Sequence, residues 1–504
     1  MKSTVYLVGA GPGDSGLITV KGKELISKAD AIVYDYLANN ALIKETKKDC
    51  KIIYAGKGLG FKAMSQNQIN KKLINLAKSG LERIVRLKGG DPFLFGRGGE
   101  EAEDLKKNKI NYEIIPGVTS AIAVPAYAGI PVTHRNITST LAIVTGHEDP
   151  EKNKTSIAWD GLAKMKSIVF LMGTKNLKKN LRNLIDNGMS RNTKIAAINW
   201  GTYSKQKTVV GTFEDIHEKI RSNKITSPSI IVIGEICKLR RTLNWFEKKP
   251  LFGKNIVVTR ARKNASVLSQ EIINLGGNAI EIPTIEIKSK PSRTIQNNIK
   301  DMKNYDWLIF TSVNGVEIFF DEFIKKFKDI RELGDVKIAA IGSETSRAIK
   351  NLKINVDLVP KLFTAEGLIG TFKKRKIKNT RILVPRAELA RDTLIKELRI
   401  NGNIVKELKI YDTVLPSKEN KKVIQNRIYK NKIDYITFTS SSTVDNFFKY
   451  ISPSQIKKQK NIAYVCIGPI TAKTLKKYKI KPSLICKKYT IDNLLKEIVK
   501  FAKK

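Results

Sequence analysis

Cysteine and histidine are scarce in this sequence. Its 504 residues include 4 cysteines and 3 histidines, and the cysteines stand far apart, with no Cys-x-x-Cys pair. The histidines show no spacing typical of metal ligands either. We therefore expect no metal site. Isolated cysteines favour core positions, and their pattern favours a reducing cytoplasm. The cysteines are Cys50, Cys237, Cys466 and Cys486.

Long apolar runs are also lacking. No segment approaches the roughly 18 apolar residues that a membrane span needs, and Met1 leads directly into a strand-like segment, not into a signal-peptide pattern. We expect no membrane partner. At roughly 150 residues per domain, the length predicts about three domains.

Acidic residues are few for so basic a chain. There are 47 Asp and Glu against 92 Lys and Arg, which gives a formal net charge of +45. Such a charge can indicate nucleic-acid binding. The lysines are, however, scattered through helix-like segments such as 44–51 and 421–432, without a basic stripe interleaved with aromatic residues. We expect solvated helix faces and no nucleic-acid partner, while the positive field would still attract a polyanionic small molecule.

Two glycine-rich turns follow apolar segments near the N-terminus. Residues 5–14 read VYLVGAGPGD, and residues 86–101 read RLKGGDPFLFGRGGEE. Glycines allow a backbone to approach a ligand closely at the end of a strand. Pro12 and Gly13 stand where a dinucleotide-binding G-x-G-x-x-G would open a helix. The turns therefore predict a ligand site in an α/β domain that differs from the usual dinucleotide site.

These turns resemble those of the uroporphyrinogen-III C-methyltransferases, which are tetrapyrrole methylases that use S-adenosylmethionine. The resemblance runs from about Thr4 to about Cys237. It implies a fold of two α/β subdomains over residues 1–245, S-adenosyl-L-methionine as cofactor, and a homodimer formed by this domain. The other motifs that carry it are VYD (33–35), GK (56–57), PGVTS (116–120) and GIPVTHR (129–135).

The resemblance also implies roles for single residues. Asp35 matches the family's proposed proton acceptor and Lys57 its proposed donor. The alternatives are a helix N-cap for Asp35 and an ordinary anion-holding lysine for Lys57. Arg97, His134 and Arg135 are candidates for binding substrate carboxylates, although Arg97 can equally pair locally, and Met172 alone also fits a core position. Residues that match the family's cofactor contacts are Pro12, Gly89, Gly90, Asp91, Leu94, Thr119, Ser120, Met172 and Gly201.

An internal repeat marks the second half. The segment DWLIFTSVNGVEIFF (306–320) recurs as DYITFTSSSTVDNFF (434–448), and KIAAIGSETSRAI (337–349) recurs as NIAYVCIGPITAKTL (461–475). Each copy reads as strand, turn and helix, which predicts two similar α/β lobes with parallel strands. Ligands of open α/β sheets lie at the carboxyl ends of strands, so the hydroxyl-rich turns are expected to rim one cleft.

With VTRA (258–261), LVPRAELARDTL (383–394) and VKELKIYDTV (405–414), this half resembles uroporphyrinogen-III synthase from about Gly253 onward. The resemblance implies a two-lobed domain over 251–504, with residues 253–283 and 413–504 in lobe one and residues 284–412 in lobe two. A charged, aromatic linker would precede it.

Tyr411 matches a tyrosine that is suspected in this family of assisting loss of the substrate hydroxyl. The alternative is a strand tyrosine packed at the lobe hinge. The candidate substrate-binding residues follow strands, where they can also serve simply as helix N-caps. They are Thr311, Ser312, Thr439, Ser440, Ser441, Gly468 and Thr471.

The two resemblances form a pathway, because the synthase's product is the methylase's substrate. The expected function is to cyclise hydroxymethylbilane to uroporphyrinogen III with inversion of the last ring, and then to methylate it twice to precorrin-2, which feeds siroheme, cobalamin or another tetrapyrrole. The alternative is a methylase half that acts on another substrate such as rRNA, with the second half a ligand-binding module.

Overall fold

The computed structural model describes residues 3–56, 63–147, 155–174, 176–259, 262–282, 284, 286–388, 392–414, 420–459 and 461–503. The chain divides into two units, Met1–Asn255 with Glu271–Ala279 and Val499–Lys504, and Ile256–Gln270 with Ile280–Ile498. Among the residues described, no helix combines the length and apolar character needed to cross a membrane.

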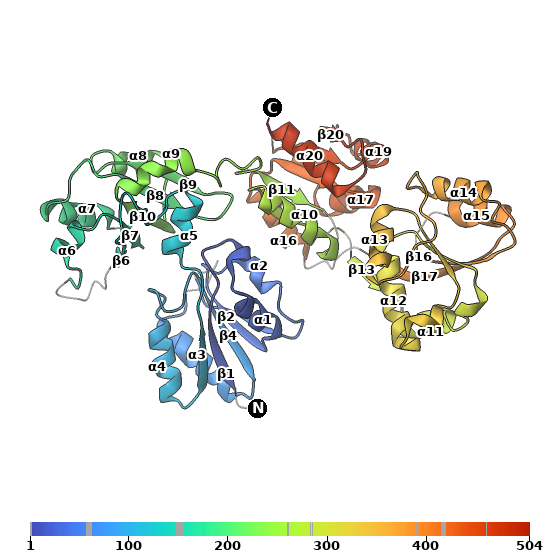
Figure 1. Cartoon of the computed structure of the whole chain (residues 1–504), viewed down its shortest axis with the longest axis horizontal. Helices are drawn as coiled ribbons and strands as arrows, with labels where there is room; N and C mark the ends of the chain where they lie inside the picture. The colour runs from blue at the N-terminus through green and yellow to red at the C-terminus, as the bar shows by residue number, and fades with distance from the viewer. Residues whose placement is uncertain are drawn as a thin grey trace. The chain divides into compact units, whose positions relative to one another are not determined.

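The first sheet is parallel, with strand order β3-β2-β4-β1-β5. Side chains alternate along β1, so that Val5 and Leu7 pack with α3 and α4, whereas Val8 packs with α1 and α2. Figure 1 shows these two pairs of helices on opposite sides of the sheet. Burial on both faces explains its almost continuous apolar strands. The elements are β1 (Thr4–Gly9), η1 (Ser15–Leu17), α1 (Val20–Lys28), β2 (Ala31–Tyr34), α2 (Asn40–Ile43), β3 (Lys51–Tyr54), α3 (Gln66–Lys78), β4 (Arg83–Lys88), α4 (Gly98–Lys107) and β5 (Asn111–Ile115).

The second sheet is mixed, with strand order β6-β7-β10-β8-β9. Strands β6 and β7 are parallel, and β10 runs antiparallel to both β7 and β8. Helix α5 packs on one face through Ala121 and Val124, and α7 packs on the other through Leu181 and Leu184. The elements are α5 (Ser120–Tyr127), β6 (Ala142–Thr145), α6 (Trp159–Ala163), β7 (Ile168–Leu171), α7 (Leu177–Asp186), β8 (Ile195–Asn199), β9 (Lys207–Gly211), α8 (Ile216–Ser222), β10 (Ser229–Ile233), η2 (Glu235–Leu239) and α9 (Arg240–Leu243).

The segment predicted as a linker, residues 240–254, belongs to the first unit. Phe246 and Leu251 are buried, the Trp245 indole N–H donates to the Ala126 carbonyl at 3.0 Å, and the Arg240 guanidinium donates to the Ala128 carbonyl at 2.6 Å. The aromatic residues therefore anchor this segment to the end of α5.

The third sheet has strand order β12-β11-β18-β19-β20. Strands β11, β18, β19 and β20 pair in parallel. The chain leaves this sheet after β12 and returns to it at β18, so the sheet is discontinuous in sequence. Its elements are β11 (Asn255–Val258), α10 (Arg262–Asn274), β12 (Asn278–Glu281), α16 (Asn420–Tyr429), β18 (Tyr435–Phe438), α17 (Ser441–Tyr450), α18 (Pro453–Lys457), β19 (Ala463–Cys466), α19 (Pro469–Lys477), β20 (Leu484–Ile485) and α20 (Ile491–Ala502).

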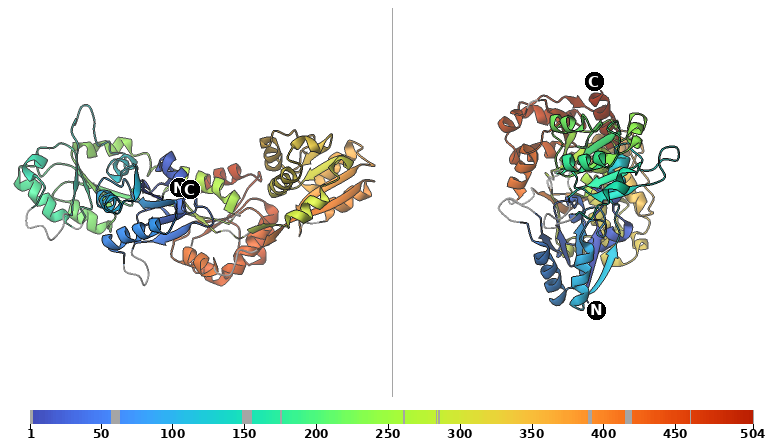
Figure 2. Two further views of the ribbon diagram at one scale, coloured as in Figure 1. Left: turned by 90° about the horizontal axis from the view of Figure 1, so that it is seen from below. Right: turned by 90° about the vertical axis from the view of Figure 1, so that its left-hand side faces the viewer.

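The fourth sheet is formed by the intervening residues, with strand order β13-β17-β16-β14-β15. Strand β13 pairs antiparallel with β17, and the other pairs are parallel. Helices α11 and α12 cover one face, and α14 and α15 the other. These helices are labelled in Figure 1, and Figure 2 gives two further views of the same ribbon. The elements are β13 (Glu286–Ser289), α11 (Ser292–Asn298), η3 (Met302–Asn304), β14 (Trp307–Phe310), α12 (Val313–Phe327), η4 (Ile330–Leu333), β15 (Lys337–Ala340), α13 (Ser343–Asn351), α14 (Ala365–Lys374), β16 (Arg381–Ala387), α15 (Thr393–Ile400) and β17 (Ile404–Val414).

The internal repeat appears as equivalent strand-turn-helix units in the third and fourth sheets. One pair is β14-α12 and β18-α17, and the other is β15-α13 and β19-α19. The predicted α/β fold with two subdomains followed by two similar α/β lobes is confirmed.

Candidate active sites

Three glycine turns meet at the carboxyl ends of β1 and β4. These strands are parallel neighbours, so the turns that follow them lie side by side. Gly11 and Gly90 exchange backbone hydrogen bonds of 2.7 and 3.2 Å. The PGVTS turn packs on them so closely that a Cβ on Gly117 would lie 2.3 Å from the Gly90 carbonyl oxygen. Only glycine fits at such a contact.

Asp91 ties these turns together. One carboxylate oxygen accepts hydrogen bonds from the backbone N–H groups of Phe93 at 2.8 Å and Leu94 at 3.0 Å, and the other accepts from Gly117 at 2.9 Å. Asp91, which is one of the predicted cofactor contacts, thus also fixes the shape of the loop. Leu94 packs against the core of the second sheet.

Gly90 faces the N-terminal turn of α5. Its φ is +67°, and a Cβ built there would lie 3.7 Å from the Ser120 backbone nitrogen and 3.9 Å from the Thr119 Cα. Thr119 is the N-cap of α5. A Cβ on Gly90 would therefore make ordinary van der Waals contacts with this turn, whereas a Cβ on the neighbouring Gly89 would lie only 2.6 Å from the Leu37 Cβ.

The turn after β8 comes to the same region, and the turn after β7 holds another predicted cofactor contact. Gly201 follows β8 and packs against Val124 of α5, and the Thr202 hydroxyl accepts a hydrogen bond from the Asp14 N–H at 2.9 Å. Met172 follows β7, is half exposed, and has a φ of 59°. Trp200 and Thr202 also have positive φ, at 49° and 69°. Such backbone strain in residues other than glycine gathers at functional sites.

Asp14 connects the turn that contains Pro12 to the second sheet. Its carboxylate accepts hydrogen bonds from the Gly16 N–H and the Tyr127 hydroxyl, both at 2.8 Å. Burial and this carboxylate raise the pKa of Tyr127, so the phenol stays a donor. The glycine turn and the end of α5 are thereby held in one arrangement.

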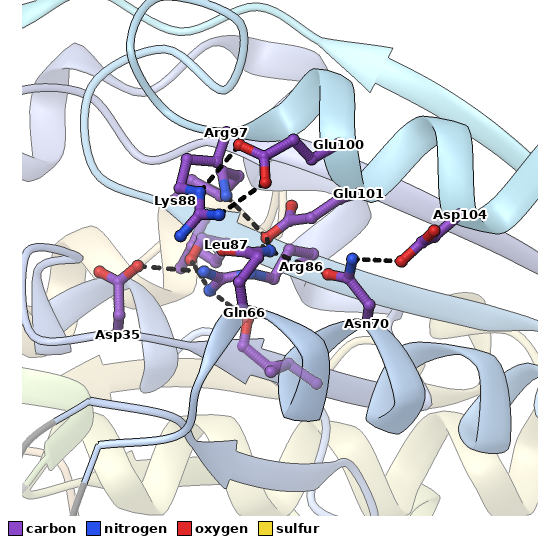
Figure 3. Close-up of polar contacts among 11 residues, drawn as sticks. Asp35, Gln66, Asn70, Arg86, Leu87, Lys88, Arg97, Glu100, Glu101 and Asp104 are labelled. Carbon is purple, nitrogen blue, oxygen red and sulfur yellow. Dashed lines mark hydrogen bonds and ion pairs between the residues drawn. The ribbon is translucent and has the colours of Figure 1, made fainter. Parts of the chain in front are cut away.

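Asp35 follows β2 and lies over a buried charge cluster (Figure 3). One carboxylate oxygen accepts from the Leu37 N–H at 3.1 Å, and the other lies 3.3 Å from the Arg86 guanidinium. It caps a short turn rather than a helix, because Asn39 is the N-cap of α2. Glu101 of α4 binds both Arg86 and Lys88 of β4, at 3.1 and 2.8 Å.

The other predicted methylase residues are more exposed. Arg97 pairs with Glu100 at 2.6 Å in the first turn of α4 and has a φ of 59°. His134 accepts the Asn136 N–H through Nδ1 at 3.3 Å, and the neighbouring Arg135 is exposed. Lys57 lies outside the described residues.

In the fourth sheet, Tyr411 of β17 is buried and lies 3.0 Å from the Ser312 hydroxyl. Burial raises the pKa of Tyr411, which the Ser312 contact opposes. Ser312 is also the N-cap of α12, and Thr311 precedes it at the end of β14. A register shift in β16 between Arg386 and Ala387 lies next to Tyr411, and such irregularities can re-aim a side chain.

The equivalent residues of the third sheet are also used as caps. Ser440 is the N-cap of α17 and forms a capping box with Thr443. Ser441 accepts a hydrogen bond from Thr474 at 2.9 Å. Gly468 is the N-cap of α19, while Thr471 is buried on that helix and Thr439 follows β18. The predicted hydroxyl-rich turns thus stand at strand ends in two separate sheets.

Arg86, Lys88 and Glu101 were not identified from the sequence. One signal was present, because Glu101 occupies an inward position of α4 together with Gly98, Ala102 and Leu105. Among the residues that the structure describes, no cluster of three His, Cys, Asp or Glu side chains could hold a metal ion.

Comparisons with known proteins match both halves. Residues 4–217 match the family model described as Tetrapyrrole (Corrin/Porphyrin) Methylases, and residues 266–496 match that of Uroporphyrinogen-III synthase HemD. The chain is 37% identical to porphyrin biosynthesis protein HemD of Ruminiclostridium josui over 497 residues, which cover 98% of this chain and 97% of the relative.

Two shorter relatives match the first half. Uroporphyrinogen-III C-methyltransferase of Bacillus subtilis (strain 168) is 48% identical over 49% of this chain and 95% of the relative. The S-adenosyl-L-methionine-dependent uroporphyrinogen III methyltransferase of Methanosarcina barkeri is 47% identical over 47% of this chain and 94% of the relative.

Proposed function

Because the chain belongs to the family in which a tetrapyrrole methylase is fused to a uroporphyrinogen-III synthase, we propose that it makes uroporphyrinogen III from hydroxymethylbilane and methylates it twice to precorrin-2. The observation that carries this proposal is the similarity to a relative along 98% of the chain. Each half also has its own set of strand-end residues.

S-adenosyl-L-methionine is the proposed methyl donor, and the glycine turns fit it. The space beside Gly90, which a Cβ would enter, suits a ligand that approaches the backbone. When bound, S-adenosyl-L-methionine supplies an electrophilic methyl group on a sulfonium. The residues that would hold it are Pro12, Gly89, Gly90, Asp91, Leu94, Thr119, Ser120, Met172 and Gly201. The Asp91 carboxylate also keeps the turns in shape.

Asp35 is the proposed proton acceptor of the methylation. It is held by the Leu37 N–H and Arg86, yet 29% of its side chain is exposed, so a substrate proton can reach it. An acid or base placed at a reacting ring suits this chemistry. Lys57 is the proposed donor, and Arg97, His134 and Arg135 are proposed to bind substrate carboxylates, since cations are the natural partners of those groups.

In the synthase half, the proposed task is to fold a flexible polyanion into the geometry that closes the ring. We propose that hydroxyls and backbone amides at the strand ends share this task, with Tyr411 assisting departure of the hydroxyl. The 3.0 Å contact between Tyr411 and Ser312 supports a joint role. The further binding residues are Thr311, Thr439, Ser440, Ser441, Gly468 and Thr471.

The proposed domains are residues 1–245 and 251–504, with lobe one formed by 253–283 and 413–504 and lobe two by 284–412. Sheet membership supports this division, since β11, β12 and β18 to β20 share one sheet and β13 to β17 share another. We also propose a homodimer through the methylase domain, acting in the cytoplasm, where the four free cysteines stay reduced.

The test is to incubate the purified protein with hydroxymethylbilane and S-adenosyl-L-methionine. We expect an isomer-III product that has gained the mass of two methyl groups. Labelling of rRNA in place of the tetrapyrrole would support the alternative substrate, and binding of hydroxymethylbilane without ring closure would reduce the second half to a binding module.

A further inference from the structure

Three buried charges lie beneath Asp35, and the proposed function gives no task to two of them, Lys88 and Glu101. The Arg86, Lys88 and Glu101 side chains are 4%, 5% and 0% exposed. Burying one charge is costly unless it is compensated, and a compensated cluster is held tightly in place. Figure 3 shows the three side chains beside Asp35, between β4 and α4.

Glu101 is the centre of this cluster. Its Oε1 atom accepts hydrogen bonds from Lys88 at 2.8 Å, from Arg86 Nε at 3.1 Å and from Gln66 at 3.1 Å. Its Oε2 atom is buried without a hydrogen-bond partner among the described residues. Arg86 is fixed further by the carbonyl oxygens of Val33 and Leu87, at 3.4 and 3.2 Å. The guanidinium that reaches Asp35 is therefore held from three sides.

The charges balance only when Asp35 is ionised. Arg86 and Lys88 then face Glu101 and Asp35, two cations against two anions. A proton on Asp35 would leave one positive charge uncompensated in a buried site. Burial and the neighbouring Arg86 already lower the pKa of Lys88, despite Glu101.

Three tyrosines also lie at or near the Asp35 turn. A Cβ on Gly56 would lie 2.6 Å from the Tyr54 hydroxyl and 3.0 Å from the Tyr36 backbone nitrogen, which places the β3 phenol at the Asp35 turn. Burial raises the pKa values of Tyr36 on this turn and of Tyr34 on β2. The charges of this cluster that act on Asp35 are those of Arg86, Lys88 and Glu101. Glu100 also acts on Lys88, but it is paired with Arg97, so this pair adds no net charge.

We propose that Lys88 and Glu101 act through Arg86 as positioning residues that set how firmly Asp35 holds the proton it receives from the tetrapyrrole. This rests on the proposed methylation. The ring loses a proton, the Asp35 carboxylate accepts it and becomes neutral, and the uncompensated cation then drives the proton on to water. The cluster thus restores the carboxylate for the second methylation.

The test is to measure kcat for methylation as a function of pH and to compare the acid limbs of the profiles, because Asp35 must be ionised to accept a proton. Removing a cation with Lys88→Gln should move the limb to higher pH by on the order of one unit. Removing the buried anion with Glu101→Gln should move it in the opposite direction. Loss of folding alone does not produce shifts of opposite sign.

Two variants serve as controls. Lys88→Arg keeps the charge and should leave the limb near its wild-type position. Asp104→Asn alters the outer edge of the network, where Asp104 accepts a hydrogen bond from Asn70 at 2.6 Å, and should not move the limb. Calorimetric titration with S-adenosyl-L-methionine checks that each variant is folded.

The outcomes separate this inference from the proposed function. If Asp35→Asn methylates at the wild-type rate, Asp35 is not the proton acceptor. If Asp35→Asn is inactive but folded Lys88→Gln has the wild-type acid limb, the positioning role of Lys88 and Glu101 is wrong, while Asp35 remains the proposed proton acceptor. If Glu101→Gln does not fold, the comparison of the acid limbs of Lys88→Gln and Lys88→Arg decides whether the charge of Lys88 acts on Asp35.

Discussion

Gly90 offers a direct test of the cofactor cradle, with Gly80 as a matched control. Both have positive φ, +67° for Gly90 and +87° for Gly80, and a Cβ on Gly80 meets nothing within 4 Å. Gly80 follows α3, away from the glycine turns. An alanine at either position must adopt the left-handed conformation, which costs about 1 to 2 kcal/mol. Gly90→Ala and Gly80→Ala should therefore lower the free energy of unfolding by similar amounts.

Only the Gly90 variant should lose cofactor affinity. A methyl group there projects toward Thr119 and Ser120, at 3.9 and 3.7 Å, where the protein itself leaves room for it. A ligand in that space would be displaced, and we expect Kd for S-adenosyl-L-methionine to rise at least about tenfold, or ~1.4 kcal/mol. Chemical denaturation gives the stability and calorimetric titration gives Kd. Equal Kd values for Gly90→Ala and Gly80→Ala would refute the cradle at Gly90.

Three further predictions concern the synthase half and the thiols. Tyr411→Phe should slow ring closure only partly, because losing the hydrogen bond to Ser312 costs about 1 to 3 kcal/mol; complete loss of isomer III in a folded variant would make Tyr411 an essential acid. Raising the salt concentration from 0.1 to 1 M should raise KM for hydroxymethylbilane, since the screening length falls from about 10 to about 3 Å; a constant KM would exclude the lysines from substrate capture. Burial raises the pKa values of Cys237 and Cys466 to about 12, so both should react slowly with a maleimide at pH 7 until the protein unfolds; rapid labelling of either in the native state would contradict their burial.

The sequence predicted what depends on local pattern. Apolar strands followed by hydroxyl-rich turns gave both copies of the repeat, β14-α12 and β18-α17, because the period of side-chain burial is readable along the chain. The glycines of the first two turns were identified for the same reason, since a turn that needs positive φ requires them.

Contacts between distant residues could not be predicted in this way. The Asp14 N–H binds Thr202, 188 positions later, and nothing near either residue indicates the other. The Asp91 carboxylate accepts a hydrogen bond from the Gly117 N–H, 26 positions later, and the pattern of the Asp91 turn gives no sign of this contact. The inward Glu101 was overlooked because glutamates are common on exposed helix faces, and only the fold places it against Arg86.

The most direct test of the account is to supply hydroxymethylbilane and S-adenosyl-L-methionine together to the wild-type protein and to Asp35→Asn, and to identify the products by mass and isomer. We predict dimethylated isomer III from the wild type and unmethylated uroporphyrinogen III from Asp35→Asn, because the two reactions use separate residues of one chain. Two results would contradict the claim that one chain carries both activities on separate residues. One is ring closure without inversion of the last ring in both samples, and the other is methylation that persists in Asp35→Asn.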